Sequence, residues 1–245
     1  MAPSPAMGDF DDIPEPAAGV RIGRWRLDER VGSGGLADVW RAVADDAPRP
    51  VALKILRDPA RSEAHVSRFV REGRLLERLR HPGLPRCHEV LLAPRPALAL
   101  DLLTGETLSE HLRHDGPLGS AAAERVAGSL LRVLAYLHQL GVVHRDVKSS
   151  NVFLADDRRV LLLDLGLAAD PADPLTTTLG DVMGTYAYMA PEQIAGAEVD
   201  HRSDLYSLGV TLYEALAGTR PFQARGAAGY LRAHRSGQVP SLDDV

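Results

Sequence analysis

The sequence of 245 residues contains little cysteine and little lysine. Cys87 is its only cysteine, so the chain can form neither an internal disulfide nor a zinc site made of cysteines alone, which suits a reducing compartment. No apolar run approaches the roughly 18 to 20 residues that a membrane span needs. The N-terminus also lacks the basic-then-apolar order of a signal peptide. We therefore expect a cytoplasmic chain without membrane contact.

Neither sign of charge dominates the composition. The chain carries 33 acidic and 28 basic residues, for a net charge of -5, and this balance gives no electrostatic footprint for a nucleic-acid partner. Hydrophobic residues make up 45% of the chain and charged residues 25%, which is typical of a packed globular protein and excludes general disorder.

Only two of the 28 basic residues are lysines, Lys54 and Lys148. In a sequence that otherwise uses arginine, a lysine is expected where a compact ammonium group on a flexible stem does what a guanidinium group cannot. The alternative is chance survival on a solvated surface, so the context of each lysine decides.

The pattern of apolar residues predicts two regions of different class after a Pro- and Ala-rich leader at residues 1–21. Strand-length segments RWRLDERV, ADVWRAV and VALKIL are followed by a helix over residues 61–80 and by strands in CHEVLL and ALALDLL. From Thr107 onward the pattern is mostly helical, most clearly over residues 124–140 and 203–216. We expect an α+β fold with a β-rich lobe at 22–103 and a helical lobe at 104–245.

Two features of the first lobe suit a phosphate group. In VGSGGLADV, residues 31–39, glycines would let backbone N–H groups approach phosphate oxygens, although an ordinary glycine-rich hairpin turn would read the same way. Lys54 shares a strand face with Ala52 and needs an anion if it points inward. Glu72, on the apolar stripe of the predicted helix, could supply that charge; otherwise Lys54 points outward to solvent.

Two polar segments of the second lobe suit phosphoryl transfer. In HRDVKSSN, Asp146 can accept a hydroxyl proton, Lys148 can neutralise a moving phosphoryl group, and the amide oxygen of Asn151 can bind magnesium. Asp164 follows the apolar run VLLL, which we interpret as a strand, and begins a DLG sequence; a carboxylate at the end of such a strand is well placed for the same cation. Taken alone, DLG could be a simple turn.

In this order, and together with GTYAYMAPE and SDLYSLGV, these segments resemble the signature of eukaryotic-type (Hanks-type) protein kinases. The resemblance covers residues 22–245. The D-x-K-x-x-N spacing is similar to the serine/threonine branch, and the preference for arginine is similar to bacterial members. The resemblance implies a bilobal fold, ATP and Mg²⁺ (with Mn²⁺ as a substitute) as cofactors, and transfer of the γ-phosphate to serine or threonine of protein substrates, including a second copy of this chain.

The resemblance also implies residue roles. Asp146, Lys148, Lys54 and Glu72 would be catalytic, and Asn151 and Asp164 would bind the metal. ATP would contact Val31, Gly32, Ser33, Gly34, Gly35, Val39, Ala52, Lys54, Leu100, Asp101, Leu103 and Phe153. Leu76, Cys87, His144 and Leu165 match a buried stack anchored by Asp204, and a redox role for Cys87 is the other reading of that residue.

Regulation and departures from the family pattern give further expectations. Arg145 before Asp146 implies activation by phosphate on Thr176, Thr177 or Thr178. Ala37 stands where a third glycine is usual. The family's arginine partner for Glu192 has no match and its last helices have no counterpart, so we expect a truncated chain. The alternatives are a pseudokinase or nucleotide-binding scaffold and, less favoured, a small-molecule kinase.

Overall fold

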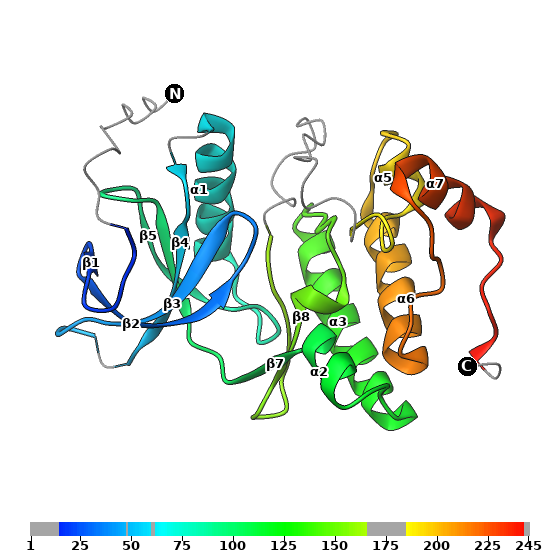
Figure 1. Cartoon of the computed structure of the whole chain (residues 1–245), viewed down its shortest axis with the longest axis horizontal. Coiled ribbons are helices and arrows are strands. Elements are labelled where there is room, and N and C mark those ends of the chain that lie inside the picture. The colour runs from blue at the N-terminus through cyan, green and yellow to red at the C-terminus, as the bar shows by residue number, and fades with distance from the viewer. Residues whose placement is uncertain (1–14, 48, 60–61, 166–184, 243–245) are drawn as a thin grey trace. The chain divides into compact units, whose positions relative to one another are not determined.

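The computed structural model describes residues 15–47, 49–59, 62–165 and 185–242. These residues form two compact units (Figure 1). One comprises the described residues of Met1–Leu79 together with Arg86–Leu103, and the other those of Arg80–Pro85 together with Thr104–Val245.

The first unit is built on an antiparallel sheet with the strand order β1-β2-β3-β4-β6-β5. The strands are β1 (Arg21–Ile22), β2 (Trp25–Ser33), β3 (Ala37–Val43), β4 (Val51–Leu56), β5 (Cys87–Leu91) and β6 (Ala97–Asp101). The strands expected from the apolar segments are confirmed, and β1 adds a short hairpin before them.

The central strand β4 is buried along nearly its whole length because both of its faces are covered. Val51, Leu53 and Ile55 belong to one apolar cluster, with Trp25 and Leu27 of β2. The residues that alternate with them face the other way, where Leu56 packs with Phe69 of the helix. Lys54 therefore stands on the face of β4 that the helix covers.

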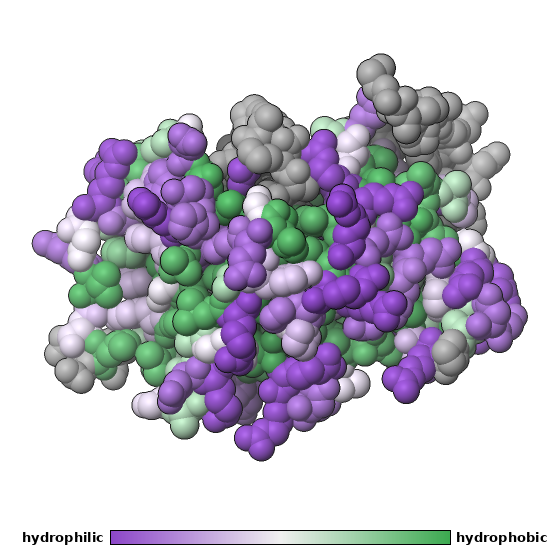
Figure 2. All heavy atoms as spheres, turned by 180° about the vertical axis from the view of Figure 1, so that it is seen from behind, coloured by the Kyte–Doolittle hydropathy of each residue, from purple (hydrophilic) through white to green (hydrophobic). Residues whose placement is uncertain are grey.

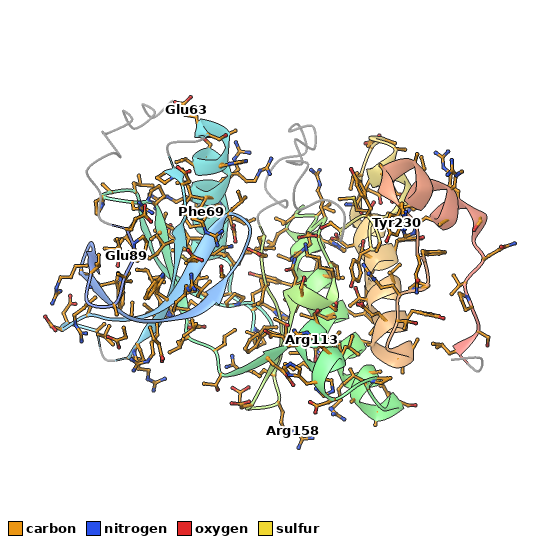
Figure 3. The ribbon with its side chains drawn as sticks, viewed as in Figure 1. Glu63, Phe69, Glu89, Arg113, Arg158 and Tyr230 are labelled. Carbon is orange, nitrogen blue, oxygen red and sulfur yellow. The ribbon has the colours of Figure 1, made fainter. Side chains whose placement is uncertain are left out.

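That helix, α1 (Glu63–Arg78), begins at Ser62, whose hydroxyl accepts a hydrogen bond from the backbone N–H of His65. Phe69 extends from α1 toward the sheet (Figure 3). At Gly73, a Cβ atom would overlap with Leu98 Cδ2, so the helix and sheet are packed closely here and a side chain at this position would require its neighbours to move. The expected helix over 61–80 is confirmed, with Glu72 among its buried residues.

The ordered part of the sheet begins inside the expected leader. The backbone of Val20 accepts a hydrogen bond from Leu27 N–H, and Ile22 is fully buried. Glu15 forms an ion pair of 3.1 Å with the buried guanidinium group of Arg95. Residues 15–21 thus contact the rest of the first unit through Val20 and Glu15, whereas residues 1–14 lie outside the described part.

The second unit combines helices with a small antiparallel sheet of order β7-β8-β9. Its elements are β7 (Gly105–Thr107), α2 (Leu108–His114), α3 (Ser120–Gln139), the 3-10 helix η2 (Ser149–Asn151), β8 (Val152–Ala155), β9 (Val160–Leu162), α5 (Pro191–Ile194), α6 (His201–Ala217) and α7 (Gly226–Ser236). The two long predicted helices correspond to α3 and α6. The strand expected from the apolar run VLLL corresponds to β9. Strands β7 and β8 were not expected in a region interpreted as mostly helical, because three or four residues are too few for a clear alternation.

The core of this unit lies along α3 and α6. Leu130, Leu134 and Leu137 of α3 are fully buried, one helical turn apart. Near α7, Tyr230 packs with Phe222 and Val210 (Figure 3). This helical unit, together with the sheet unit and its one helix, confirms the α+β protein-kinase fold.

On the face shown in Figure 2, hydrophilic residues are interspersed with hydrophobic ones. Within the described residues, no helix has both the length and the apolar character that a membrane crossing requires.

Candidate active site

The glycine-rich segment is the turn between β2 and β3. The two strands pair up to Gly32 opposite Val39 and Ser33 opposite Asp38, and Gly34 N–H donates to the carbonyl of Ala37 at 2.9 Å. Residues 33–36 are exposed, and because the Gly34 N–H is used within the turn, a phosphate group would contact the remaining N–H groups.

Arg57, which directly follows β4, connects this turn to the sheet by hydrogen bonds. Its Nη2 atom donates to Ser33 Oγ at 2.8 Å, to the Gly34 carbonyl at 2.7 Å and to Asp38 Oδ1 at 2.9 Å. The hydrogen bond from Arg57 lowers the pKa of Asp38, so the carboxylate stays charged. Sequence reasoning missed Arg57 and Asp38, because an arginine just after a strand carries no motif of its own.

Lys54 and Glu72 form the ion pair that was expected between β4 and α1. Lys54 Nζ lies 2.9 Å from Glu72 Oε1, and the two side chains are 16% and 5% exposed. The Lys54 ammonium also lies 5.9 Å from the centre of the Phe69 ring. Because both side chains are largely shielded from water, the charged form of each residue is stabilised mainly by the other.

The other residues expected to contact ATP in the first unit lie on neighbouring strands or beside the sheet. Val39 is opposite Lys54 in the ladder, and Ala52 is opposite Leu100. The N–H of Asp101 donates to the Arg86 carbonyl at 3.0 Å, so this amide is already used within the unit. The remaining predicted contacts of this unit are Val31, Gly35 and Leu103, all outside the core.

In the second unit, Asp146 forms hydrogen bonds with two other polar residues of the HRDVKSSN segment. Its Oδ2 atom accepts hydrogen bonds from Lys148 Nζ at 2.8 Å and from Asn151 Nδ2 at 3.0 Å. Among the described residues, nothing donates to its buried Oδ1 atom. The structure thus brings together the three residues predicted from this segment and leaves one carboxylate oxygen able to accept a proton.

The pKa of Asp146 is raised. Burial is the main cause, the charge of Lys148 opposes it, and the negative charge of Asp164 adds to it. The two aspartates therefore lie close enough to influence each other. Asp164 itself is exposed, with a left-handed backbone of φ 59° that turns it out of the strand-like run before it.

Asn151 and Asp164 fit a hard cation. Asn151 donates its Nδ2 atom to the carbonyl and the carboxylate of Asp146, which turns its amide oxygen the other way. The backbone carbonyl of Asn151 accepts from Leu163 N–H at 2.7 Å, so the two ligand-bearing segments are tied together. An amide oxygen and an exposed carboxylate are ligands that Mg²⁺ accepts, with phosphate oxygens and water completing the shell. Phe153, the expected adenine contact of this unit, is a partly buried residue of β8.

The loop that carries Asp146 is held in place by hydrogen bonds to Asp204 of α6. The fully buried Asp204 carboxylate accepts backbone N–H groups of His144 at 2.9 Å and Arg145 at 2.7 Å, as well as His138 Nε2 at 2.7 Å. Gln193 Nε2 donates to the carbonyl of Arg145 at 2.9 Å. These bonds fix Arg145 in a left-handed conformation of φ 67°, which costs a non-glycine residue about 1 to 3 kcal/mol.

Glu192 has a hydrogen-bond partner that sequence analysis did not find. Ser203 Oγ donates to Glu192 Oε1 at 2.5 Å. Among the described residues, this hydroxyl at the start of α6 reaches the carboxylate in place of the arginine that was not found in the sequence.

Of the residues expected in the buried stack, Cys87 behaves as a small apolar residue. It is 3% exposed, and burial raises its pKa to about 11, so its thiol is protonated at neutral pH. Leu76, His144 and Leu165 are buried as well. Thr176, Thr177 and Thr178 fall outside the described residues.

Comparison with known proteins agrees with this geometry. Residues 25–240 match the protein kinase domain. The chain is 38% identical over 236 residues to serine/threonine-protein kinase PknA of Mycobacterium tuberculosis, covering 93% of this chain and 54% of that protein. It is 36% identical to PknL of the same species, covering 91% and 56%, and 36% identical to pkn3 of Myxococcus xanthus, covering 89% and 42%.

The chain thus spans about half the length of the curated relatives it matches. Within that span, the match includes both the sheet unit with its Lys54–Glu72 pair and the helical unit with its Asp146 cluster. The chain belongs to the protein kinase family, among the bacterial Hanks-type serine/threonine kinases.

Proposed function

We propose that this chain transfers the γ-phosphate of ATP to serine or threonine hydroxyl groups of protein substrates. The observation that carries the proposal is the Asp146 carboxylate, of which one oxygen is held by Lys148 and Asn151 while the buried Oδ1 receives no hydrogen bond from the described residues. An acceptor prepared in this way suits a hydroxyl group that loses its proton as phosphoryl transfer proceeds.

Each catalytic residue then has a role set by its surroundings. Asp146 orients the substrate hydroxyl and accepts its proton. Lys148, whose Nζ lies 2.8 Å from Asp146 Oδ2, places a positive charge beside the Asp146 carboxylate, where it would neutralise the phosphoryl group being transferred. Asn151 and Asp164 would hold Mg²⁺, which neutralises phosphate charge when it is bound.

The first unit would hold ATP itself. The turn of residues 31–35 would cover the phosphates through its backbone N–H groups. Lys54, oriented by Glu72, would bind the α- and β-phosphates. Val39, Ala52 and Leu100 would contact adenine. Since the N–H of Asp101 is used by Arg86, adenine would bond to its carbonyl and to the Leu103 backbone.

The test is phosphate incorporation from radiolabelled ATP into a general protein substrate and into the chain itself. Asp146→Asn should lower the rate about 100-fold or more, since general-base catalysis contributes on this scale. Asp157→Asn, which alters an exposed aspartate in the β8–β9 turn, is the matched control and should leave the rate unchanged. Equal incorporation by wild type and Asp146→Asn would reject the proposal in favour of a pseudokinase.

We also propose that phosphate on Thr176, Thr177 or Thr178 raises activity. The support is the resemblance to kinases in which an arginine precedes the catalytic aspartate, as Arg145 does here. Mass spectrometry after incubation with ATP should find phosphate on this segment, and the triple alanine variant should be less active. Full activity of that variant would contradict this proposal without affecting the assignment of Asp146.

A further inference from the structure

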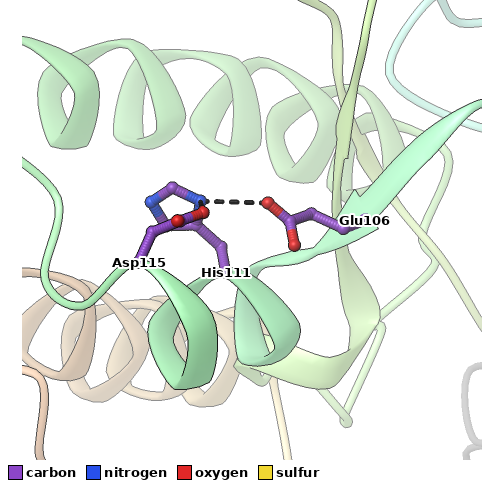
Figure 4. Close-up of side chains that lie close together, drawn as sticks. All are labelled: Glu106, His111 and Asp115. Atoms are coloured by element: carbon purple, nitrogen blue, oxygen red, sulfur yellow. Dashed lines mark hydrogen bonds and ion pairs between the residues drawn. The ribbon is translucent and has the colours of Figure 1, made fainter.

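Three ligating side chains lie together in the second unit without a role in the proposed reaction. His111 Nδ1 is 3.1 Å from Glu106 Oε1 and 3.3 Å from Asp115 Oδ2. Figure 4 shows the Glu106 carboxylate reaching the imidazole ring from the strand, while Asp115 approaches it from the end of the helix. The three ligand atoms lie within 4.8 Å of one another.

The backbone that carries this cluster is firmly fixed. Glu106 is in β7, paired with Leu154 of β8, and Gly105 approaches β8 so closely that a Cβ atom there would overlap with the Leu154 carbonyl oxygen. Immediately afterwards, Thr107 and Glu110 cap the start of α2 reciprocally. The strand and the helix therefore meet at a set angle.

The end of α2 is fixed as well. The N–H of Asp115 donates to the carbonyl of His111 at 2.8 Å, which closes the last turn and places these two side chains above each other on one helix face. The backbone that carries the three side chains is thus fixed before any ligand arrives, which lowers the entropic cost of binding.

The distances and charges suit a metal ion. With metal–ligand bonds of about 2.0 to 2.2 Å, neighbouring ligands of a tetrahedral zinc ion are about 3.3 to 3.6 Å apart. The distances from His111 Nδ1 to Glu106 Oε1 and to Asp115 Oδ2, 3.1 and 3.3 Å, are close to this spacing between ligands. Without a metal, a single N–H at Nδ1 can point at only one of the two carboxylates, whereas a cation would be bound by all three groups at once.

We propose that Glu106, His111 and Asp115 bind a zinc ion, with water as its fourth ligand. Imidazole selects a borderline transition metal over Mg²⁺ or Ca²⁺, which prefer oxygen ligands only. Asp115 is 63% exposed and Glu106 36%, so both the ion and the water can enter from solvent. The ion would join β7 to α2, and the site shares no residue with the proposed catalytic site.

The experiment is a titration of the whole chain with Co²⁺ as the spectroscopic probe, in excess Mg²⁺ so that the Asn151–Asp164 site is occupied. We expect one equivalent of Co²⁺ to give the visible absorption of tetrahedral cobalt and one equivalent of Zn²⁺ to abolish it. His111→Gln and, independently, Asp115→Asn should weaken binding at least ten-fold, since even residues that only support a ligand change metal affinity by about 10- to 100-fold.

His114→Gln, an exposed histidine of the same helix that lies outside the cluster, is the matched control and should bind cobalt as the wild type does. Asp146→Asn should also bind normally, so failure of the kinase proposal would not affect this one. A wild-type chain without the tetrahedral band, or a band that survives in both His111→Gln and Asp115→Asn, would overturn the proposal. Circular dichroism of each variant establishes that it is folded.

Discussion

Two aspartates of the helical unit have different surroundings. Asp204 accepts three hydrogen bonds, spread over both of its oxygens. Asp146 accepts its hydrogen bonds on one oxygen alone, and its pKa is raised, with burial as the first cause. The first arrangement suits a carboxylate that holds a backbone in place, and the second suits one that must accept a proton.

This difference predicts how stability depends on pH at Asp146. Because its folded pKa is raised above the ordinary value of 3.8, the folded state binds the proton more tightly than the unfolded chain does. The charged carboxylate therefore lowers stability at neutral pH, and this cost disappears as pH falls through the folded pKa to below 3.8. Asp146→Asn should melt at a higher temperature than the wild type at pH 7, and the gap should narrow toward pH 4.

Thermal unfolding of both proteins between pH 7 and pH 4 checks this expectation. Asp157→Asn serves as the control, because hydrogen bonds from Arg159 lower the pKa of this exposed aspartate. An Asp146→Asn variant that melts below the wild type at pH 7 would contradict the burial argument.

Residue types that stand out by composition or motif could be predicted from the sequence. Lys54 was identified because lysine is rare in this chain, and Glu72 because a carboxylate on an apolar stripe needs a partner. Arg57 could not be identified, because it is one of many arginines and its three contacts depend on the shape of the β2–β3 turn. His111 and its carboxylates were missed for a similar reason, since their meeting depends on the angle between β7 and α2.

At the scale of elements, the β2–β3 hairpin depends on one side chain from the end of β4. Arg57→Ala should free the glycine turn and raise the KM for ATP about two- to five-fold, since half-exposed ion pairs are worth up to about 1 kcal/mol. Steady-state kinetics at varied ATP concentration measure this effect, and hydrogen exchange at residues 33–38 should become faster.

Arg41→Ala is the matched control, because Arg41 pairs with Asp28 across the same two strands but away from the turn. An equal rise in KM for both variants would show that loss of any ion pair in the hairpin, rather than release of the turn, explains the result.

Helix α6 supports the loop before Asp146, and this predicts a large effect of Asp204→Asn. The variant replaces one carboxylate oxygen with an amide nitrogen that faces buried donors, at a cost of about 3 kcal/mol or more in the free energy of unfolding. Asp200→Asn at the start of the same helix should cost little, because asparagine caps a helix about as well as aspartate does. Urea unfolding followed by circular dichroism distinguishes the two, and equal losses would refute the anchoring role.

The length of an element decided how well it could be predicted. Helices α1, α3 and α6 carry several turns of apolar periodicity and were predicted, although α3 begins at Ser120, four residues before the expected start. Strand β9 was expected from the run VLLL. Strands β7 and β8 have three and four residues and are stabilised by pairing within the small sheet, which no local pattern records.

At the scale of the whole molecule, ATP with Mg²⁺ should raise the melting temperature, because a ligand that binds only the folded state stabilises it by mass action. At a hundredfold excess over the dissociation constant the gain is about 2.7 kcal/mol. Removing Mg²⁺ with a chelator should diminish this gain, and Asp164→Asn should lose the Mg²⁺-dependent part. Asp157→Asn should behave as the wild type does, and an undiminished gain in Asp164→Asn would argue against Asp164 as a ligand.

The close contact at Gly73 has a consequence for the charged pair beside it. Glu72 lies next to the point where α1 approaches Leu98 and Val90, and the absence of a side chain at position 73 permits this close approach beside the Lys54–Glu72 pair. Alanine there would require either the side chains of Leu98 and Val90 or the helix itself to move, and a movement of the helix would lengthen the Lys54–Glu72 contact. Gly73, which has no side chain of its own, thereby influences the contact between the Lys54 ammonium and the Glu72 carboxylate.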